Sequence, residues 1–180
     1  MAIPVEPSAA VDPASLAKQA RAGSSRALGD LYRLYGQALF RVAYRLTGSR
    51  EDAEDVLHDV FVGLPEAMAR YEERGRLDTW LRRVTARAAL MRLRKQRRQT
   101  DLQLEQHSSA YAAPERRDTQ DLQRAVNALP VPLRSVLVLK EIEGYSHAET
   151  AEMLGISVVT SRVRLMRAMG RLRRMLGGKR

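Results

Sequence analysis

Arginines near the carboxyl end of the chain are spaced as in a helix that contacts nucleic acid. Arg162, Arg164 and Arg167 follow Ser157 and Thr160, just after a glycine-containing turn. A guanidinium group can donate two hydrogen bonds to a guanine edge or a phosphate, and a hydroxyl suits either. The pattern predicts a helix that reads duplex DNA; the alternative is an ordinary helical hairpin with a solvated basic face. The candidate contact residues are Ser157, Thr160, Ser161, Arg162, Arg164 and Arg167.

The two most basic segments of the chain lie far apart in the sequence. Residues 71–100 hold ten Arg or Lys and three acidic residues, and residues 155–180 hold eight basic residues and no acidic one. Since the net charge is +10, the rest of the chain carries −5. One such segment alone would be a solvated helical face. Two of them, each attached to a recognisable motif, indicate two contacts with one long polyanion.

Other chemistry has little support in the sequence. Asp55 and His58 share a helix face and could suggest a metal site, but metal sites in helical bundles need ligand sets on several helices and no second set exists. Because the chain has no cysteine, disulfides and thiolate zinc sites are excluded. The three histidines are scattered, and neither a glycine-rich phosphate loop nor a nucleophile–base pair is present. We expect no metal, no cofactor, no small-molecule substrate and no enzymatic activity.

Apolar residues at helical spacing predict the elements that position these residues. A first run stops at Thr47 and Gly48, and Ser49 then caps a second helix with an acidic first turn. Pro65 interrupts that helix, which should kink or restart near Leu64. A third helix should begin at a cap on residue 78 or 79, with its apolar side formed by Trp80, Val84, Ala88 and Met91.

Residues 144–157 have the parts of a helix-turn-helix. Ser146 and Glu149 form a capping box at the start of its first helix. Ala151 is small where the two helices must cross, and Gly155 with Ile156 makes and seats the turn. The arginine-bearing helix follows directly.

These patterns predict an all-α protein of two small helical domains joined by a flexible linker. Aromatic residues make up only 5% of the chain, which does not suit a sheet. We expect a disordered segment at residues 1–14, a first domain at 15–98, a linker at 99–118 and a helix-turn-helix domain at 119–177. Neither a signal-peptide pattern nor an apolar run of about 20 residues is present, so we expect a cytoplasmic protein without direct membrane insertion.

Two segments of the chain resemble the extracytoplasmic-function (ECF) sigma factors of bacterial RNA polymerase. Residues 129–168, which include the helix-turn-helix, resemble the fourth conserved region of that family without a gap. Residues 46–61 and 80–83 resemble the second conserved region. The two matches stand in the family's order, with the expected linker between them.

The resemblance implies an alternative sigma factor that directs core RNA polymerase to specific promoters. Its partners would be the clamp helices of the largest polymerase subunit, the flap of the second largest, promoter DNA and an anti-sigma factor. Polymerase would be bound by a helix face that is acidic and partly apolar, and that DNA would repel: Asp52, Glu54, Asp55, His58, Asp59 and Phe61. The minus-ten element, as a single strand, would be held by Arg76, Trp80, Arg83, Arg87 and Arg94. The six residues between 157 and 167 named above would read the minus-thirty-five element.

Two alternatives bear on these assignments. Trp80 is a lone tryptophan at the start of a helix, where core packing is more common than DNA contact. A polymerase-independent helix-turn-helix regulator, for example a dimer on a palindrome, would explain the carboxy-terminal segment. It would leave the acidic helix and the segment around Trp80 without a role.

Overall fold

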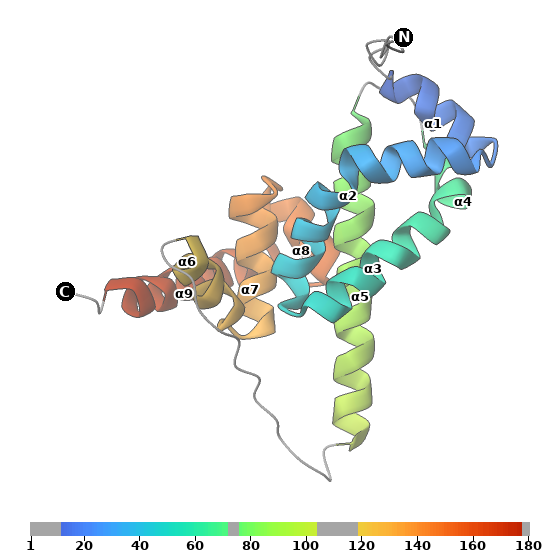
Figure 1. Cartoon of the computed structure of the whole chain (residues 1–180). Helices are drawn as coiled ribbons and strands as arrows, with labels where there is room; N and C mark the ends of the chain where they lie inside the picture. Colours follow the sequence, from blue (N-terminus) through green and yellow to red (C-terminus); the bar gives the residue numbers. More distant parts are fainter. Residues whose placement is uncertain (1–11, 72–75, 104–118, 178–180) are drawn as a thin grey trace, which may run out of the picture.

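The computed structural model describes residues 12–71, 76–103 and 119–177, and every element in these ranges is helical (Figure 1). The expected all-α fold is therefore confirmed. We call the helices up to residue 103 the first module and those from residue 119 the second module. Residues 1–11, most of the expected disordered segment, and 104–118, most of the expected linker, lie outside the described residues.

The first module holds five helices among the described residues. They are α1 (Pro13–Arg21), α2 (Ser25–Thr47), α3 (Arg50–Val62), α4 (Leu64–Met68) and α5 (Leu77–Gln103). Gly48 ends α2 with φ 76°, and the Ser49 hydroxyl accepts a hydrogen bond from the Asp52 N–H at 3.3 Å, as the cap pattern predicts. The break between α3 and α4 falls at Gly63, with Pro65 in the first turn of α4.

Three sequence-based boundaries in the first module were wrong. Helix α1 begins at Pro13, inside the segment expected to be disordered, because the Asp12 carboxylate caps it through the N–H groups of residues 14 and 15. Helix α5 begins at Leu77, before the expected cap, and runs to Gln103, five residues into the expected linker. Met91, expected on the apolar side of α5, is 68% exposed. The buried side is formed by Leu77, Leu81, Thr85, Ala86, Ala89 and Leu90.

The second module contains the predicted helix-turn-helix. Its elements are α6 (Thr119–Asn127), α7 (Val131–Leu137), η1 (Val138–Ile142), α8 (His147–Leu154) and α9 (Val158–Gly177). The capping box of Ser146 and Glu149 is formed in full, and Gly155 makes the turn with φ 66°. The short π-helix η1 continues α7 and was not predicted; its wider turn ends at Glu143.

The two modules share one hydrophobic core. Residues of α2 and α5, such as Leu46 and Leu90, belong to the same buried cluster as Leu139 of η1, Met153 of α8 and Ala168 of α9. A separate cluster fills the space between α1, α2, α4 and the start of α5. In Figure 1 the second module accordingly lies directly beside the end of α2 and the middle of α5.

Candidate nucleic-acid interface

Helix α9 presents a basic face to solvent. Ser157 caps it by accepting a hydrogen bond from the Thr160 N–H at 3.0 Å, and the two hydroxyls lie 2.8 Å apart. Arg162 and Arg167 are exposed, and Arg164 is half-buried. Since successive helix residues turn by about 100°, Arg162 and Arg164 point about 160° apart. By the same rule Arg162 and Arg167 lie about 140° apart and border the exposed face on its two sides, whereas Arg164 lies nearer the buried side.

Ser161 does not join this face. Its side chain is fully buried, and its hydroxyl lies 3.0 Å from Nδ1 of His147 in α8. The sequence-based inclusion of Ser161 among the DNA-contacting residues does not fit this geometry, because the hydroxyl faces the neighbouring helix. Its visible role is to join the two helices of the helix-turn-helix.

Two apolar side chains occupy the centre of the exposed face of α9. Val159 and Met166 are each 68% exposed and lie on the side of the helix opposite to Ser161, Ala168 and Leu172, which are buried. The charge pattern did not single them out. Exposed apolar groups on a helix that enters the major groove suit the methyl group of thymine.

The candidate minus-ten residues form a second basic surface, which we call the α5 face. It consists of Arg76, Trp80, Arg83, Arg87 and Arg94. Trp80 is partly buried against the core and its ring centroid lies 4.9 Å from that of Tyr71, so it packs and lines a surface at once. A pocket of about 860 Å³ adjoins it, lined by Arg70, Tyr71, Arg76, Thr79, Trp80 and Arg83 from the first module and by Glu143, Gly144, Tyr145 and Glu149 from the second.

The second module contacts part of the α5 face, while Arg76, Arg87 and Arg94 remain exposed. Arg94 donates a hydrogen bond to the backbone carbonyl of Met153 at 2.7 Å, and Arg87 lies 3.9 Å from the Glu152 carboxylate. Tyr145 is buried beside the pocket, and this burial, followed by the nearby Glu143 carboxylate, raises the pKa of its phenol.

The six candidate polymerase-binding residues of α3 divide into two sides of the helix. Asp52 and Asp55 face α5, where Arg92 donates a hydrogen bond to each at 2.6 Å and Gln96 donates a further one to Asp52 at 2.7 Å. Asp59 borders the same side, in the hollow between α3 and α5. The side chain of Asp52 is only 17% exposed, so it already has a structural role within the first module.

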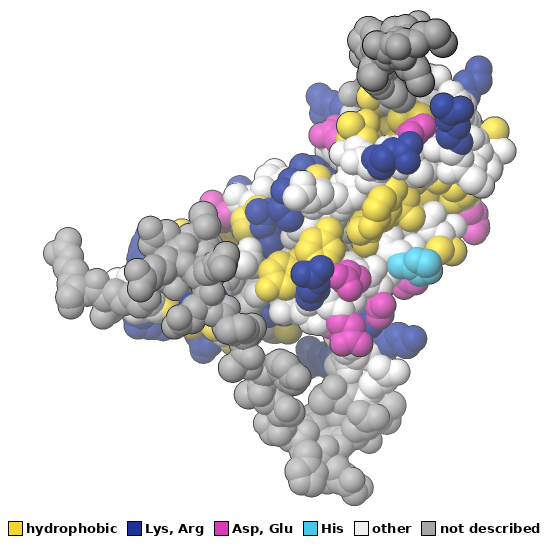
Figure 2. Space-filling view, viewed as in Figure 1, with side chains coloured by type: hydrophobic (Ala, Val, Ile, Leu, Met, Phe, Trp, Pro, Cys, Tyr) yellow, Lys and Arg dark blue, Asp and Glu magenta, His cyan; other side chains and the backbone are white. Residues whose placement is uncertain are grey.

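The other three residues of α3 border a groove between α2 and α3. Glu54 and His58 line it directly, and the ring of Phe61 makes an edge contact with Tyr32 at 5.1 Å. Figure 2 shows a band of hydrophobic side chains crossing this face, with acidic side chains and a histidine beside it. The α2 residues of this α2–α3 groove are Tyr32, Arg33, Gly36, Gln37 and Phe40. Sequence reasoning missed them, although exposed Tyr32 and Leu34 lie off the apolar stripe of α2 and could have indicated a surface.

Arg134 of α7 was matched to a family pattern in the sequence but given no role, and it is a central contact between the modules. Only 6% of the residue is exposed, and its guanidinium donates to three backbone carbonyls: Leu46 at 3.0 Å, Thr47 at 2.8 Å and Asn127 at 2.9 Å. Two of these are free carbonyls at the carboxyl end of α2, where a cation is favoured. Burial lowers the pKa of this guanidinium.

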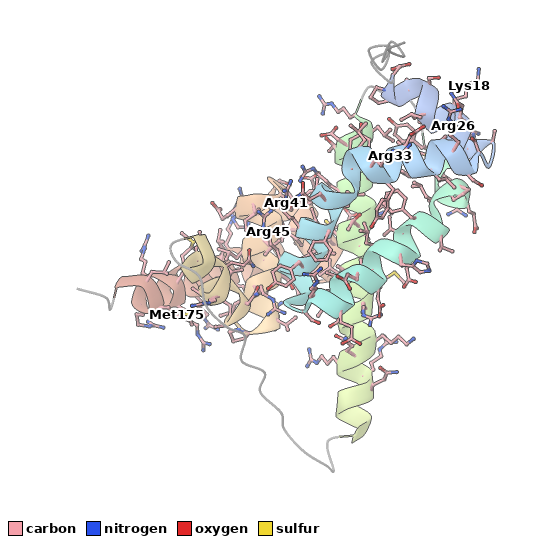
Figure 3. The ribbon with its side chains drawn as sticks, in the orientation of Figure 1. Lys18, Arg26, Arg33, Arg41, Arg45 and Met175 are labelled. Carbon is pink, nitrogen blue, oxygen red and sulfur yellow. The ribbon has the colours of Figure 1, made fainter. Side chains whose placement is uncertain are left out.

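Glu143, at the end of η1, joins the same interface. Its side chain is only 3% exposed and lies 3.7 Å from Arg45 and 3.4 Å from Arg82. Figure 3 shows Arg45 near the end of α2, beside the second module, whereas Lys18 and Arg26 lie at the far end of the first module.

Metal-ligand clusters and membrane-spanning helices are both absent from the residues that the structure describes. Within them, no group of three or more His, Asp or Glu side chains could hold a metal ion. Among their helices, none combines the length and the hydropathy that a membrane span requires.

The fold and its two basic surfaces define a two-module helical protein of the kind that contacts promoter DNA. The chain matches the family described as Sigma-70 region 2 over residues 31–99 and the family described as Sigma-70, region 4 over residues 119–172. It is 32% identical over 160 residues to the ECF RNA polymerase sigma factor SigM of Mycobacterium tuberculosis, covering 87% of this chain and 80% of that protein. It is 26% identical to SigW of Bacillus subtilis, covering 88% and 94%.

Solved structures agree with this. The sigma factor RpoE of Bartonella quintana, in complex with the anti-sigma factor NepR, has a TM-score of 0.63 at 24% identity and covers 84% of this chain and 98% of that one. CnrH, in complex with the cytosolic domain of CnrY, has a TM-score of 0.56 at 28% identity and covers 92% and 97%. The chain belongs to the ECF sigma factors of RNA polymerase. It acts as an alternative sigma factor that directs the polymerase to promoters.

Proposed function

We propose a division of this work between named surfaces of the chain. The α2–α3 groove binds the clamp helices of core polymerase, the α5 face holds the minus-ten strand, and the exposed face of α9 reads the minus-thirty-five duplex. The chain supplies binding and positioning, and it catalyses no reaction of its own. The observation that carries the proposal is that α9, directly after a helix-turn-helix turn, turns Arg162 and Arg167 to solvent while Ser161 and Ala168 are buried.

Electrostatics and shape support the assignment of polymerase and DNA to different surfaces of the chain. The α2–α3 groove combines apolar rings with the Glu54 carboxylate, a surface suited to a protein rather than to DNA phosphates. The α5 face and α9 instead present arginines, with Trp80 and Tyr71 available for stacking beside the α5 face. Asp52 and Asp55 are proposed to contact polymerase less directly than His58, because Arg92 already binds both of them.

A run-off transcription assay with purified core polymerase and fragmented genomic DNA tests this assignment. We expect discrete transcripts that require the protein. His58→Ala should weaken core binding about tenfold, the usual effect of removing one central contact. Arg167→Ala should leave core binding intact and reduce transcripts. Lys18→Ala, at an exposed position of α1, is the matched control and should change neither.

The outcomes separate the two classes of function. Specific DNA binding without core binding or new transcripts would refute the assignment and favour a polymerase-independent regulator. Core binding that survives His58→Ala and a second groove variant, Tyr32→Ala, would refute the α2–α3 groove as the polymerase surface.

The salt dependence of duplex binding distinguishes arginines of α9 that contact phosphates from arginines that contact bases. An arginine that contacts phosphate should, when replaced by alanine, lower the salt slope of duplex binding by about one unit. Replacing an arginine that contacts a base with alanine should weaken duplex binding by about 1 to 3 kcal/mol through the loss of contact at one base position. No change for Arg162, Arg164 and Arg167 alike would remove α9 from the DNA interface.

We also propose an anti-sigma partner for this chain. The support comes from RpoE, solved with the anti-sigma factor NepR, and from CnrH, solved with the cytosolic domain of CnrY. Co-purification of a tagged chain from its host, followed by run-off assays with the captured protein, tests this. A captured protein that does not inhibit transcription would refute the proposal.

A further inference from the structure

The side chains at the centre of the exposed face of α9 carry no hydrogen-bond donor. Val159 and Met166 are seven residues apart, so they point within about 20° of each other and lie about 10 Å apart along the helix axis. Val163 is half-buried and points about 40° away from Val159. We call these three side chains the α9 ridge. The middle of the helix face that follows the helix-turn-helix turn is therefore apolar.

The surroundings of the α9 ridge indicate that its ligand is DNA. Arg162 points about 60° to one side of Val159 and Arg167 about 80° to the other, and both arginines are exposed. An apolar strip between two cations matches the major groove, where base edges form the floor and phosphates lie on both sides. Helix α9 is also the second helix of the helix-turn-helix, the one that enters this groove. The α9 ridge is thus placed to meet the base edges.

The chemistry of the α9 ridge limits which base edges it can read. In the major groove guanine, adenine and cytosine present hydrogen-bonding groups, and thymine presents a methyl group beside its carbonyl oxygen. Valine has no polar group and methionine has only a weak acceptor, so neither can distinguish the polar edges by bonding to them. Contact with a thymine methyl group removes apolar surface of both partners from water. The α9 ridge therefore favours thymine.

We propose that Val159 and Met166 determine the specificity of this sigma factor for its minus-thirty-five element, by contacting the C5 methyl groups of two thymines. Their separation of about 10 Å corresponds to about three base-pair steps of about 3.4 Å each. The two thymines therefore lie about three positions apart, on either strand. Arg162 and Arg167 contact phosphates on the two sides and fix the position of α9 in the groove. The proposal rests on the assignment of α9 to the minus-thirty-five duplex.

Replacement of thymine by deoxyuridine tests this, because it removes the methyl group and keeps every hydrogen-bonding group of the base. Holoenzyme is assembled from core polymerase and the full chain, and its preferred element is selected from duplex promoters randomised over the minus-thirty-five region. Each thymine of that element is then replaced singly, and the Kd is measured by competition with a labelled duplex. We expect two positions at which deoxyuridine weakens binding about fourfold, the effect of leaving one methyl group unburied.

Truncation of the α9 ridge connects each methyl group with one side chain. Val159→Ala should bind thymine and deoxyuridine equally at one of the two positions, and Met166→Ala at the other, because the partner of the methyl group is removed. Each variant is compared with itself on two duplexes, so a change in its stability does not alter the ratio.

The same helix offers matched controls for both substitutions. Val158 is 37% exposed and points about 100° away from Val159, and Met175 is 41% exposed and points about 160° away. Figure 3 shows Met175 near the carboxyl end of α9. Val158→Ala and Met175→Ala should both keep the full fourfold discrimination between thymine and deoxyuridine.

Cytosine and 5-methylcytosine provide an independent check, since the second base carries the methyl group on a different hydrogen-bonding edge. Cytosine at either position should bind more weakly than thymine. Its C5-methylated form should regain about fourfold in affinity, and Val159→Ala or Met166→Ala should abolish the gain at the corresponding position. Equal binding of cytosine and 5-methylcytosine at both positions would contradict recognition through the methyl group.

The outcomes separate this proposal from the assignment on which it rests. Sequence-specific binding without any difference between thymine and deoxyuridine would overturn the proposal and leave α9 as the DNA-reading helix. A selected element that lacks thymine on both strands would do the same. Discrimination that persists in both Val159→Ala and Met166→Ala would assign the methyl contacts to other residues. The absence of any preferred element, with unchanged affinity in Arg162→Ala and Arg167→Ala, would overturn the proposal and the α9 assignment together.

Discussion

Replacement of Arg92 by methionine tests whether Asp52 and Asp55 serve the fold or the polymerase. Arg92 joins α5 to α3 through hydrogen bonds of 2.6 Å to each carboxylate. Methionine retains most of the aliphatic stem, so the variant removes the charge-assisted bonds and little packing. The hydrogen bond to Asp52 is the first cause of the raised pKa of Arg92. Because its pKa is raised, the guanidinium stays protonated and able to donate both bonds until the solution is strongly alkaline.

The expected loss in the free energy of unfolding follows from the solvent exposure of the two carboxylates. Asp52 is 17% exposed, and a charge-assisted bond there is worth about 1.5 kcal/mol or more. Asp55 is 52% exposed, and solvent screening reduces its share to about 0.5 kcal/mol. We therefore expect Arg92→Met to lower the free energy of unfolding by about 2 kcal/mol, or Tm by about 4 to 8 °C for a chain of this size.

Urea unfolding followed by circular dichroism measures this, with a double-mutant cycle against Asp52→Asn and Asp55→Asn. Since one apolar core spans both modules, a single transition is expected. The coupling of Arg92 with Asp52 should exceed its coupling with Asp55. A coupling below about 0.5 kcal/mol for both, together with lost core-polymerase binding in either asparagine variant, would refute the reasoning and return both carboxylates to the polymerase surface.

Three further outcomes are expected. Gly48→Ala should cost about 1 to 2 kcal/mol more than Gly155→Ala in urea unfolding: both glycines have positive φ, but only at residue 48 does the new Cβ lie 2.8 Å from Arg134. Equal losses would show that Arg134 moves aside freely. Hydrogen bonds from Ser146 lower the pKa of Glu149, so its contribution is present above the ordinary value of 4.5 and is lost as pH falls through the lowered one. The protection factors in the first turn of α8, which are corrected for the intrinsic pH dependence of hydrogen exchange, should fall in acid, and Glu149→Gln should abolish that fall; a persistent acid effect would point to another group. Ser161→Ala should lower stability by about 1 kcal/mol and leave duplex affinity unchanged, whereas a fall in affinity alone would restore Ser161 to the DNA surface.

Local features of the fold were predictable because they depend on neighbours in sequence. The cap at Ser49, the capping box of Ser146 and Glu149, and the turn at Gly155 all involve residues within a few positions of one another. For the same reason the pattern located the helix-turn-helix and the basic face of α9.

Side-chain orientation was predicted less well. Met91 was placed on the apolar side of α5, but the first module packs against Ala86, Ala89 and Leu90 instead, which periodicity over a helix rich in alanine and arginine does not distinguish. Ser161 was placed among the exposed polar residues, since residue type does not show which side of α9 meets α8.

The contact between the modules was beyond sequence reasoning. Arg134 bonds to backbone carbonyls more than 80 positions away, and main-chain groups leave no residue pattern to match. Only the structure places Glu143 beside Arg82 and Glu152 beside Arg87 of α5.

The hydrogen bonds of Arg134 have an evolutionary consequence. Its acceptors at Leu46 and Thr47 are main-chain carbonyls, so on the α2 side substitution cannot delete the bonding groups themselves. Mutational drift in those two side chains changes packing while the polar contact persists. The contact is therefore most sensitive to substitution of Arg134 itself and of Gly48, where an added Cβ would lie 2.8 Å from the guanidinium. Recombination that exchanges the second module between related chains would transfer Arg134 with it. Any recipient whose α2 ends in the same backbone conformation could then form the same hydrogen bonds.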